Sequence, residues 1–223
     1  MTSSDATDHA ATHFPPHRTR IKICGITSPE LAHVAVASGA DAVGLVFAPD
    51  SPRHVEFETA VEIVEVLPPF VTAVGLFQLT SRLNEDLEDW WEEWCQLHGE
   101  ENEDLVDEVA DTHRVIRGFR FSRDAVERWN ACEAVDALLI DGGAGGTGES
   151  FDHAELAAMR NEITKPIILA GGLTPNNVAE AIRNVRPFAV DVSSGVESER
   201  GVKSPDLIRA FCAAVREADA ALA

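Results

Sequence analysis

Hydrophobic positions along the chain fall into two alternating patterns from residue 20 onward. Short apolar runs rich in β-branched residues, typical of buried strands, alternate with longer stretches in which apolar side chains recur every three or four positions. The strand-like runs span residues 21–24, 42–47, 71–77, 113–119, 136–140, 165–170 and 188–192. The helix-like stretches span residues 28–38, 57–67, 122–131, 174–183 and 204–222. This alternation predicts a parallel sheet whose strands are joined by helices.

The number of strands decides between two parallel architectures. Seven strands are clear, and an eighth is needed between a helix near 81–91 and an acidic helix near 101–110, where residues 94–97 are the only candidate. Eight strand–helix units over residues 21–222 average about 25 residues each, which fits a compact (β/α)8 barrel. An open doubly wound sheet has about five or six strands and a glycine-rich first turn, whereas the glycine-rich turns here come late. We therefore predict a single-domain α/β fold, a (β/α)8 TIM barrel over residues 20–223, preceded by a disordered leader over residues 1–19.

Composition and charge exclude several classes of partner. The chain has 38 acidic and 18 basic residues, which gives a net charge of −20. Neither nucleic acid nor an anionic membrane is therefore expected as a partner. No run approaches the roughly 18 apolar residues of a membrane span, and the N-terminal residues lack the apolar core of a secretory signal. The cysteines are widely spaced, which favours free thiols; they are Cys24, Cys95, Cys132 and Cys212. These features predict a soluble cytoplasmic protein.

The acidic surplus has a second implication. Only Lys22, Lys165 and Lys203 are lysines, and carboxylates crowd the segments 56–66, 84–94 and 99–111. Such a surface repels itself until salt shortens the Debye length, which is ~10 Å at 0.1 M and about 3 Å at 1 M. The sequence therefore favours a halophilic protein over one with an ordinary acidic surface.

A barrel of this kind carries its active site at the C-terminal ends of the strands. Glycine and serine follow the last two expected strands, where small residues let backbone N–H groups approach an anion. Such turns at the seventh and eighth strands predict a phosphate site, although tight turns alone also use glycine. The residues concerned are Gly171, Gly172, Ser193, Ser194 and Gly195.

Asp141 ends the strand at 136–140 and precedes a glycine-rich loop over residues 142–148. A loop of this composition can cover a ligand, which would partly desolvate Asp141 and raise its carboxyl pKa into the range of a general acid. The alternative is an aspartate that caps a turn.

Cys24 ends the first expected strand, and strand alternation places Lys22 and Cys24 on its inner face. A cationic neighbour favours the thiolate, although a buried cysteine is more often inert. Asp191 on the eighth strand is expected to point inward and pair with Lys22, because an unpaired charge there would be costly. Arg53 suits a substrate carboxylate if it does not simply lie on the solvated surface.

Seven motifs in order resemble one family. They are KICGIT, GADAVGLVFAPDSPRHV, VGLF, QLHGE, LLIDGGAGGTGESFD, PIILAGGLTPNNVAEAI and PFAVDVSSGVESERGVK. They are similar to those of the phosphoribosylanthranilate isomerases of tryptophan biosynthesis. The resemblance implies a (β/α)8 barrel without metal or cofactor that performs an Amadori rearrangement. Its substrate would be a small phosphosugar–anthranilate conjugate, and the protein would be a monomer or homodimer.

The resemblance also implies roles for individual residues. It makes Cys24 the general base, Asp141 the general acid and Arg53 the ligand of the anthranilate carboxylate. Gly171, Gly172, Ser193, Ser194 and Gly195 match its phosphate-binding turns. Two positions depart from the family pattern: the segment before QLHGE leaves the role of His98 open, and His153 replaces an aromatic residue. The alternatives are a barrel like indole-glycerol-phosphate synthase, whose chemistry relies on lysines at strand ends, and a phosphosugar-binding barrel without turnover.

Overall fold

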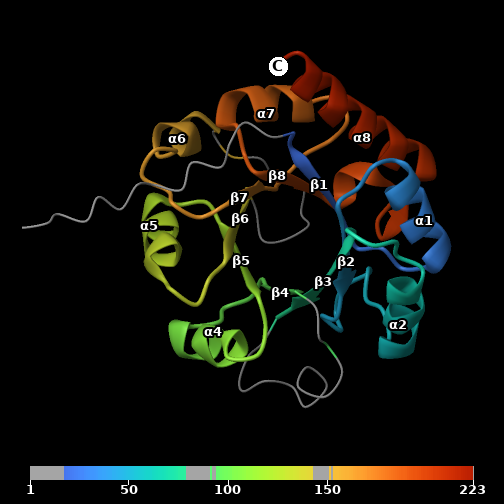
Figure 1. Ribbon diagram of the computed structural model, residues 1–223, viewed down its shortest axis with the longest axis horizontal. Coiled ribbons are helices and arrows are strands. Elements are labelled where there is room, and N and C mark those ends of the chain that lie inside the picture. Colours follow the sequence, from blue (N-terminus) through green and yellow to red (C-terminus); the bar gives the residue numbers. More distant parts are fainter. Residues whose placement is uncertain (1–17, 79–90, 92–93, 143–150, 152, 223) are drawn as a thin grey trace, which may run out of the picture.

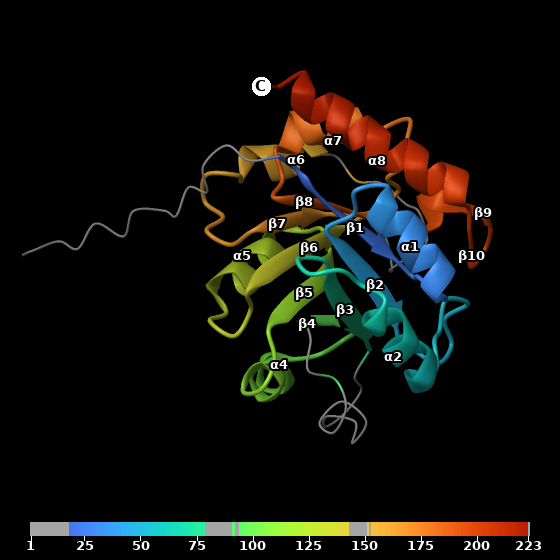
Figure 2. The same cartoon turned by 45° about the vertical axis from the view of Figure 1, so that its right-hand side comes forward.

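The computed structural model describes residues 18–78, 91, 94–142, 151 and 153–222. Eight parallel strands close into a barrel in chain order, β1 pairing with both β2 and β8. Figures 1 and 2 show this cylinder surrounded by helices. The strands are β1 (Arg20–Cys24), β2 (Ala42–Val46), β3 (Thr72–Phe77), β4 (Trp94–Leu97), β5 (Val115–Arg120), β6 (Ala137–Asp141), β7 (Ile167–Leu169) and β8 (Ala189–Val192). The expected (β/α)8 barrel is thus confirmed, including the strand at 94–97.

Helices follow the strands and cover the outside of the barrel. They are α1 (Pro29–Ala37), α2 (Phe57–Glu65), α4 (Glu103–Ala110), α5 (Arg123–Ala131), α6 (His153–Ala158), α7 (Val178–Val185) and α8 (Pro205–Ala220). Ser28, Ser122 and Ser204 cap α1, α5 and α8 by accepting a backbone N–H of the first turn. In the part of the chain that the structure describes, no helix has the length and apolar character that a membrane crossing requires.

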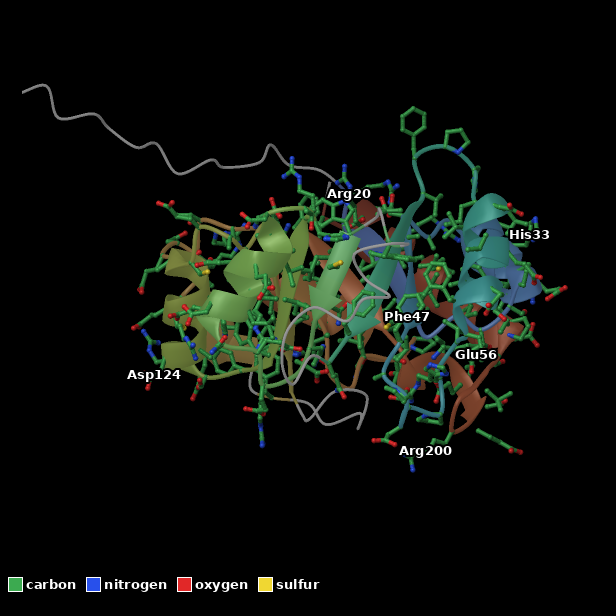
Figure 3. All side chains as sticks on the ribbon, turned by 90° about the horizontal axis from the view of Figure 1, so that it is seen from below. Arg20, His33, Phe47, Glu56, Asp124 and Arg200 are labelled. Atoms are coloured by element: carbon green, nitrogen blue, oxygen red, sulfur yellow. The ribbon has the colours of Figure 1, made fainter. Side chains whose placement is uncertain are left out.

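Alternation along the strands separates two cores. Outward residues such as Ile23 and Leu45 belong to the large apolar cluster between the strands and the helices. Inward residues form a smaller cluster inside the barrel that includes Val74, Ile116 and Leu139. Closer to the C-terminal ends of the strands, the same inward alternation brings polar side chains into the barrel. Figure 3 shows Arg20, which begins β1, and Arg200, on the loop between β9 and β10, at opposite ends of the molecule.

Several details differ from the sequence prediction. After β8 the chain forms a short 3-10 helix (Ser194–Val196) and then an antiparallel hairpin of β9 (Glu197–Glu199) and β10 (Val202–Lys203), none of which the hydrophobic pattern indicated. Helix α6 was also not expected. The expected helix at 81–91 and most of the glycine-rich loop at 142–148 lie outside the described residues.

Residues 18 and 19, the last two of the expected leader, contact the barrel domain. Thr19 is buried, and its backbone N–H and hydroxyl both donate to the Asp219 carboxylate at 2.7 Å. Arg18 pairs with Asp41. Polar residues can therefore belong to the folded domain when a carboxylate satisfies them, which a pattern of apolar positions does not register. Residues 1–17 lie outside the described part, so a leader there stays a prediction.

Candidate active site

A cavity of about 800 Å³ opens at the C-terminal ends of the strands. Its lining contains every site residue that the sequence predicted: Cys24, Arg53, Asp141, Gly171, Gly172, Ser193, Ser194 and Gly195. His98 and Asp191 also line it. Because these residues come from the ends of different strands, the closed barrel rather than any local motif brings them together.

Cys24 lies beside a buried ion pair. The Lys22 Nζ lies 2.8 Å from Asp191 Oδ1, and both side chains are less than a tenth exposed. The inward pairing of Lys22 with Asp191 is therefore confirmed. Although burial alone would lower it, the Asp191 carboxylate and Cys24 raise the pKa of the Lys22 ammonium above its ordinary value.

Lys22 favours the Cys24 thiolate, as expected, but it does not decide the net direction of the Cys24 pKa. Burial raises the pKa of the Cys24 thiol above its ordinary value, and the Lys22 ammonium offsets this only in part. The Asp191 carboxylate adds to the rise. A thiolate at this position is thus scarcer than in water, but it is also a stronger base once it forms.

Gly44 on β2 provides the space for this group of side chains. A Cβ there would lie 2.8 Å from Cys24 Sγ and 3.0 Å from Lys22 Nζ. Distances this short are not tolerated between unbonded heavy atoms of these kinds without movement. The absence of a side chain at residue 44 therefore allows the thiol and the ammonium to lie side by side.

Asp141 ends β6 and is 6% exposed. His98 Nε2 lies 4.0 Å from Asp141 Oδ2. The Gln96 side-chain amide lies 2.9 Å from His98 Nδ1. Burial lowers the pKa of His98 to about 4, so the imidazole is neutral near pH 7. The raised pKa expected for Asp141 stays a prediction.

Arg53 enters the cavity from the loop after β2 and is 9% exposed. Its Nε and Nη2 donate to the two carboxylate oxygens of Glu197 at 2.7 and 3.0 Å. The arginine stem crosses Gly25, whose φ of +77° suits glycine and where a Cβ would lie 2.7 Å from Arg53 Cδ. Arg53 is therefore fixed next to the residue that follows Cys24, and the surface alternative is excluded.

The two turns predicted to bind phosphate contact each other. Gly171 and Gly172 adopt φ values of 86° and 62°, and the Asn177 side chain donates to the Gly172 carbonyl at 2.8 Å. A Cβ on Gly195 would overlap the Leu173 carbonyl, so the turn after β8 packs directly against the turn after β7. Helix α7 begins just beyond, at Val178. Close backbones beside a helix N-terminus are the surroundings that an anion requires.

Sequence reasoning missed three residues of the site. Gln96 could have been found, because it shares the inward face of its strand with His98. Glu197 and Lys203 could not, since only the hairpin of β9 and β10 returns them to the strand ends.

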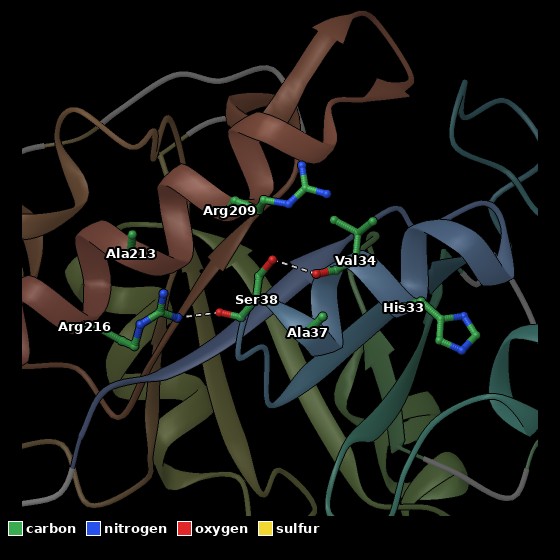
Figure 4. Close-up of a pocket in the computed structure, with 7 residues that line it drawn as sticks. All are labelled: His33, Val34, Ala37, Ser38, Arg209, Ala213 and Arg216. Atoms are coloured by element: carbon green, nitrogen blue, oxygen red, sulfur yellow. Dashed lines mark hydrogen bonds between the residues drawn. The ribbon is translucent and has the colours of Figure 1, made fainter.

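A second hollow, of about 590 Å³, lies between α1 and α8 on the outside of the barrel (Figure 4). It is lined by His33, Val34, Ala37, Ser38, Arg209, Ala213 and Arg216. Arg216 donates to the Ser38 carbonyl across it, as Figure 4 shows. This lining contains neither a carboxylate nor a thiol, so of these two hollows the cavity at the strand ends is the one that offers both.

Comparisons with known proteins agree on one family. A family model described as N-(5'phosphoribosyl)anthranilate (PRA) isomerase matches residues 21–214. An N-(5'-phosphoribosyl)anthranilate isomerase of Leptothrix cholodnii is 44% identical over 214 residues, which cover 92% of this chain and 94% of the relative. The crystal structure of phosphoribosyl anthranilate isomerase from Thermus thermophilus superimposes with a TM-score of 0.80 at 39% identity, covering 89% of this chain and 99% of that one. A relative in complex with reduced 1-(o-carboxyphenylamino)-1-deoxyribulose 5-phosphate gives 0.76 at 39% identity, with the same coverage.

Proposed function

The chain belongs to the N-(5'-phosphoribosyl)anthranilate isomerase family, and on this premise we propose that Cys24 and Asp141 are the general base and the general acid of the reaction. The enzyme is an intramolecular aldose–ketose isomerase of tryptophan biosynthesis. One observation carries the assignment of roles: a thiol on β1 and a carboxyl group on β6 line the same cavity. The shorter path around the barrel between them crosses only β7 and β8, whose turns are the proposed phosphate site.

The proposed reaction moves two protons. Asp141 donates a proton to the ring oxygen of the ribose, the bond from C1 to this oxygen breaks, and the nitrogen lone pair forms a Schiff base at C1. Cys24 then removes the proton from C2, the electrons of that C–H bond form the C1–C2 double bond of an enol-amine, and the electrons of the C1–N double bond return to nitrogen. Tautomerisation, in which the C2 hydroxyl loses its proton and C1 gains one, gives the ketose, and exchange with solvent returns Cys24 and Asp141 to their starting states. The raised pKa of Cys24 suits the second step, because a strongly basic thiolate is needed to remove a proton from carbon.

We also propose that Arg53 and the two turns bind the charged ends of the substrate. Arg53 would hold the anthranilate carboxylate in a forked hydrogen bond. The backbone N–H groups of Gly171, Gly172 and residues 193–195 would hold the phosphate. Inorganic phosphate is then expected to inhibit competitively.

The direct test generates the substrate in place from anthranilate and ribose 5-phosphate and follows the anthranilate fluorescence. We expect the purified protein to convert it to the ketose. A folded protein that binds the conjugate without turnover would favour the non-catalytic barrel. Conversion of the ketose to an indole with loss of carbon dioxide would favour a barrel like indole-glycerol-phosphate synthase, although Lys22 is held by Asp191 and Lys203 by Glu197.

We further propose that the enzyme is cytoplasmic, a monomer or homodimer, and adapted to salt. Its charge of −20 favours the last point, as do helices α2 and α4, whose first turns carry acidic residues and whose last turns carry no basic ones. Salt would screen the mutual repulsion of the surface carboxylates and so stabilise the folded state.

Salt is therefore expected to raise the thermal midpoint of the purified enzyme. Each kcal/mol of added stability raises the midpoint of a chain this long by about 2–4 °C. Thermal unfolding measured by circular dichroism between 0.05 and 2 M KCl checks this, with sucrose at matched osmolarity as an uncharged control. A flat or falling midpoint, or an equal rise in sucrose, would argue for an ordinary acidic surface.

A further inference from the structure

The Glu197 carboxylate is saturated with hydrogen bonds. It accepts from Arg53 Nε and Nη2, from Lys203 Nζ at 2.6 Å and from the Gly201 backbone N–H at 3.0 Å. Its side chain is 4% exposed. Burial alone would raise the pKa of Glu197, but the hydrogen bonds from Arg53 and Lys203 lower it to about 2, so the group is ionised at any working pH.

Lys203 is equally enclosed, with a side chain that is 0% exposed. Its Nζ donates to Glu197 and also lies 3.0 Å from the Ser193 carbonyl and 3.3 Å from the Ser193 hydroxyl. Burial lowers the pKa of Lys203 below its ordinary value, and the hydrogen bond and charge of Glu197 oppose this. Three acceptors match the three N–H bonds of an ammonium group and so favour the charged form. Lys203 cannot reach a substrate, because its donors are already used within the protein.

The charges of these three side chains do not cancel. Two cations, Arg53 and Lys203, surround one carboxylate, which leaves one positive charge next to the cavity. Without Lys203, the bidentate pair of Arg53 with Glu197 would be neutral and would attract an anion only weakly. This matters because the described lining of the cavity contains two arginines, Arg53 and Arg200, against five carboxylates, namely Asp50, Asp141, Asp191, Glu197 and Glu199.

The hydrogen bonds also determine which face of Arg53 remains for a ligand. Glu197 occupies Nε and one N–H of Nη2, and among the described residues no hydrogen bond is made by Nη1. The carboxylate therefore holds one edge of the guanidinium plane, and the edge with Nη1 keeps N–H groups for a ligand of the cavity that Arg53 lines. The turn at Gly201, whose N–H donates to Glu197, packs against Pro52. A Cβ at residue 201 would lie 2.7 Å from the Pro52 carbonyl.

We propose that Glu197 and Lys203 are positioning residues that make the enzyme selective for a carboxylate on the aromatic amine of its substrate. Glu197 orients the Arg53 guanidinium, and Lys203 supplies the positive charge that lets the Arg53–Glu197 pair attract an anion. Lys203 also ties the same cluster to the Ser193 turn, which fixes the spacing between the carboxylate and phosphate subsites. The inference rests on the proposed role of Arg53.

The test compares two substrates that differ only in this carboxylate. Ribose 5-phosphate is condensed either with anthranilate or with aniline, and kcat/KM is measured for each conjugate. The ratio of the two values reports the contribution of the carboxylate. It does not depend on the fraction of folded enzyme, and comparing the ratio of a variant with that of the wild type cancels the intrinsic reactivity of the two conjugates. Lys203→Met is expected to lower this ratio roughly ten-fold, the loss of one unit charge at short range in a partly buried site.

Two further variants separate the effect of the Lys203 charge from the effect of Glu197 on the orientation of Arg53. Lys165→Met removes the same charge from a lysine that donates to the Val135 carbonyl away from the cavity, and it should leave the ratio unchanged. Glu197→Gln makes the cluster more positive, yet it is expected to lower the ratio, because an amide cannot accept both N–H groups of Arg53. A rise in the ratio for Glu197→Gln would overturn the aiming role, and an unchanged ratio for Lys203→Met would overturn the charge role. If the wild-type enzyme converts neither conjugate, the proposed function itself fails.

Discussion

Replacing Asp141 by asparagine is expected to lower kcat about 1,000-fold while leaving the fold intact, the range that a lost general acid gives. The amide has nearly the shape of the carboxyl group but cannot deliver a proton to the ribose ring oxygen. Substrate binding should change little, because Arg53 and the turns after β7 and β8 hold the charged ends. Steady-state kinetics by anthranilate fluorescence would show the loss in kcat rather than in KM.

A matched control lies directly before the same strand. Asp136 precedes β6 at the opposite end of the barrel, where its carboxylate accepts from Arg114 at 2.7 Å and from the Val115 N–H at 2.8 Å. Asp136→Asn makes the same chemical change and should lower stability slightly but not kcat. An Asp141→Asn enzyme as active as this control would contradict the acid role of Asp141.

Replacing Cys24 by alanine is expected to have a comparable effect, again about 1,000-fold in kcat, because the C2 proton then has no base. Cys132→Ala is the control, since Cys132 is also a free thiol and does not line the cavity. The pH dependence adds a check with a definite sign. Burial raises the Cys24 pKa, so the thiolate should form only above the ordinary pKa of cysteine, which the pH dependence of thiolate absorbance, taken as the difference between the wild type and Cys24→Ala, would show. A Cys24→Ala enzyme with wild-type turnover would exclude this role.

Much of this site could be predicted from strand alternation and strand order. Alternation along β1 predicted that Lys22 and Cys24 face inward. Closure of the barrel beside β8 predicted the pairing of Lys22 with Asp191, and the structure places Lys22 Nζ 2.8 Å from Asp191 Oδ1. These inferences succeed because a barrel fixes which side chains face inward and which strands are neighbours.

Other properties of the site depend on burial and on tertiary contacts, which cannot be read from the sequence. Burial raises the Cys24 pKa and the Lys22 charge lowers it. The net direction depends on how completely the protein encloses the thiol. The partners of Arg53 depend on a hairpin whose return is set by tertiary contacts, such as that between Gly201 and Pro52. The neutral state of His98 likewise follows from burial, which the QLHGE motif does not specify.

The most direct test of the account distinguishes the two proton transfers within one reaction. Ribose 5-phosphate carrying deuterium at C2 gives a conjugate in which only the step assigned to Cys24 breaks a C–D bond. If Cys24 removes this proton and Asp141 opens the ring, Cys24→Ser should show a large primary isotope effect on kcat, because proton removal limits its rate. Asp141→Asn should show almost none, because ring opening limits its rate instead. A large isotope effect in Asp141→Asn together with none in Cys24→Ser would contradict the assignment of base and acid.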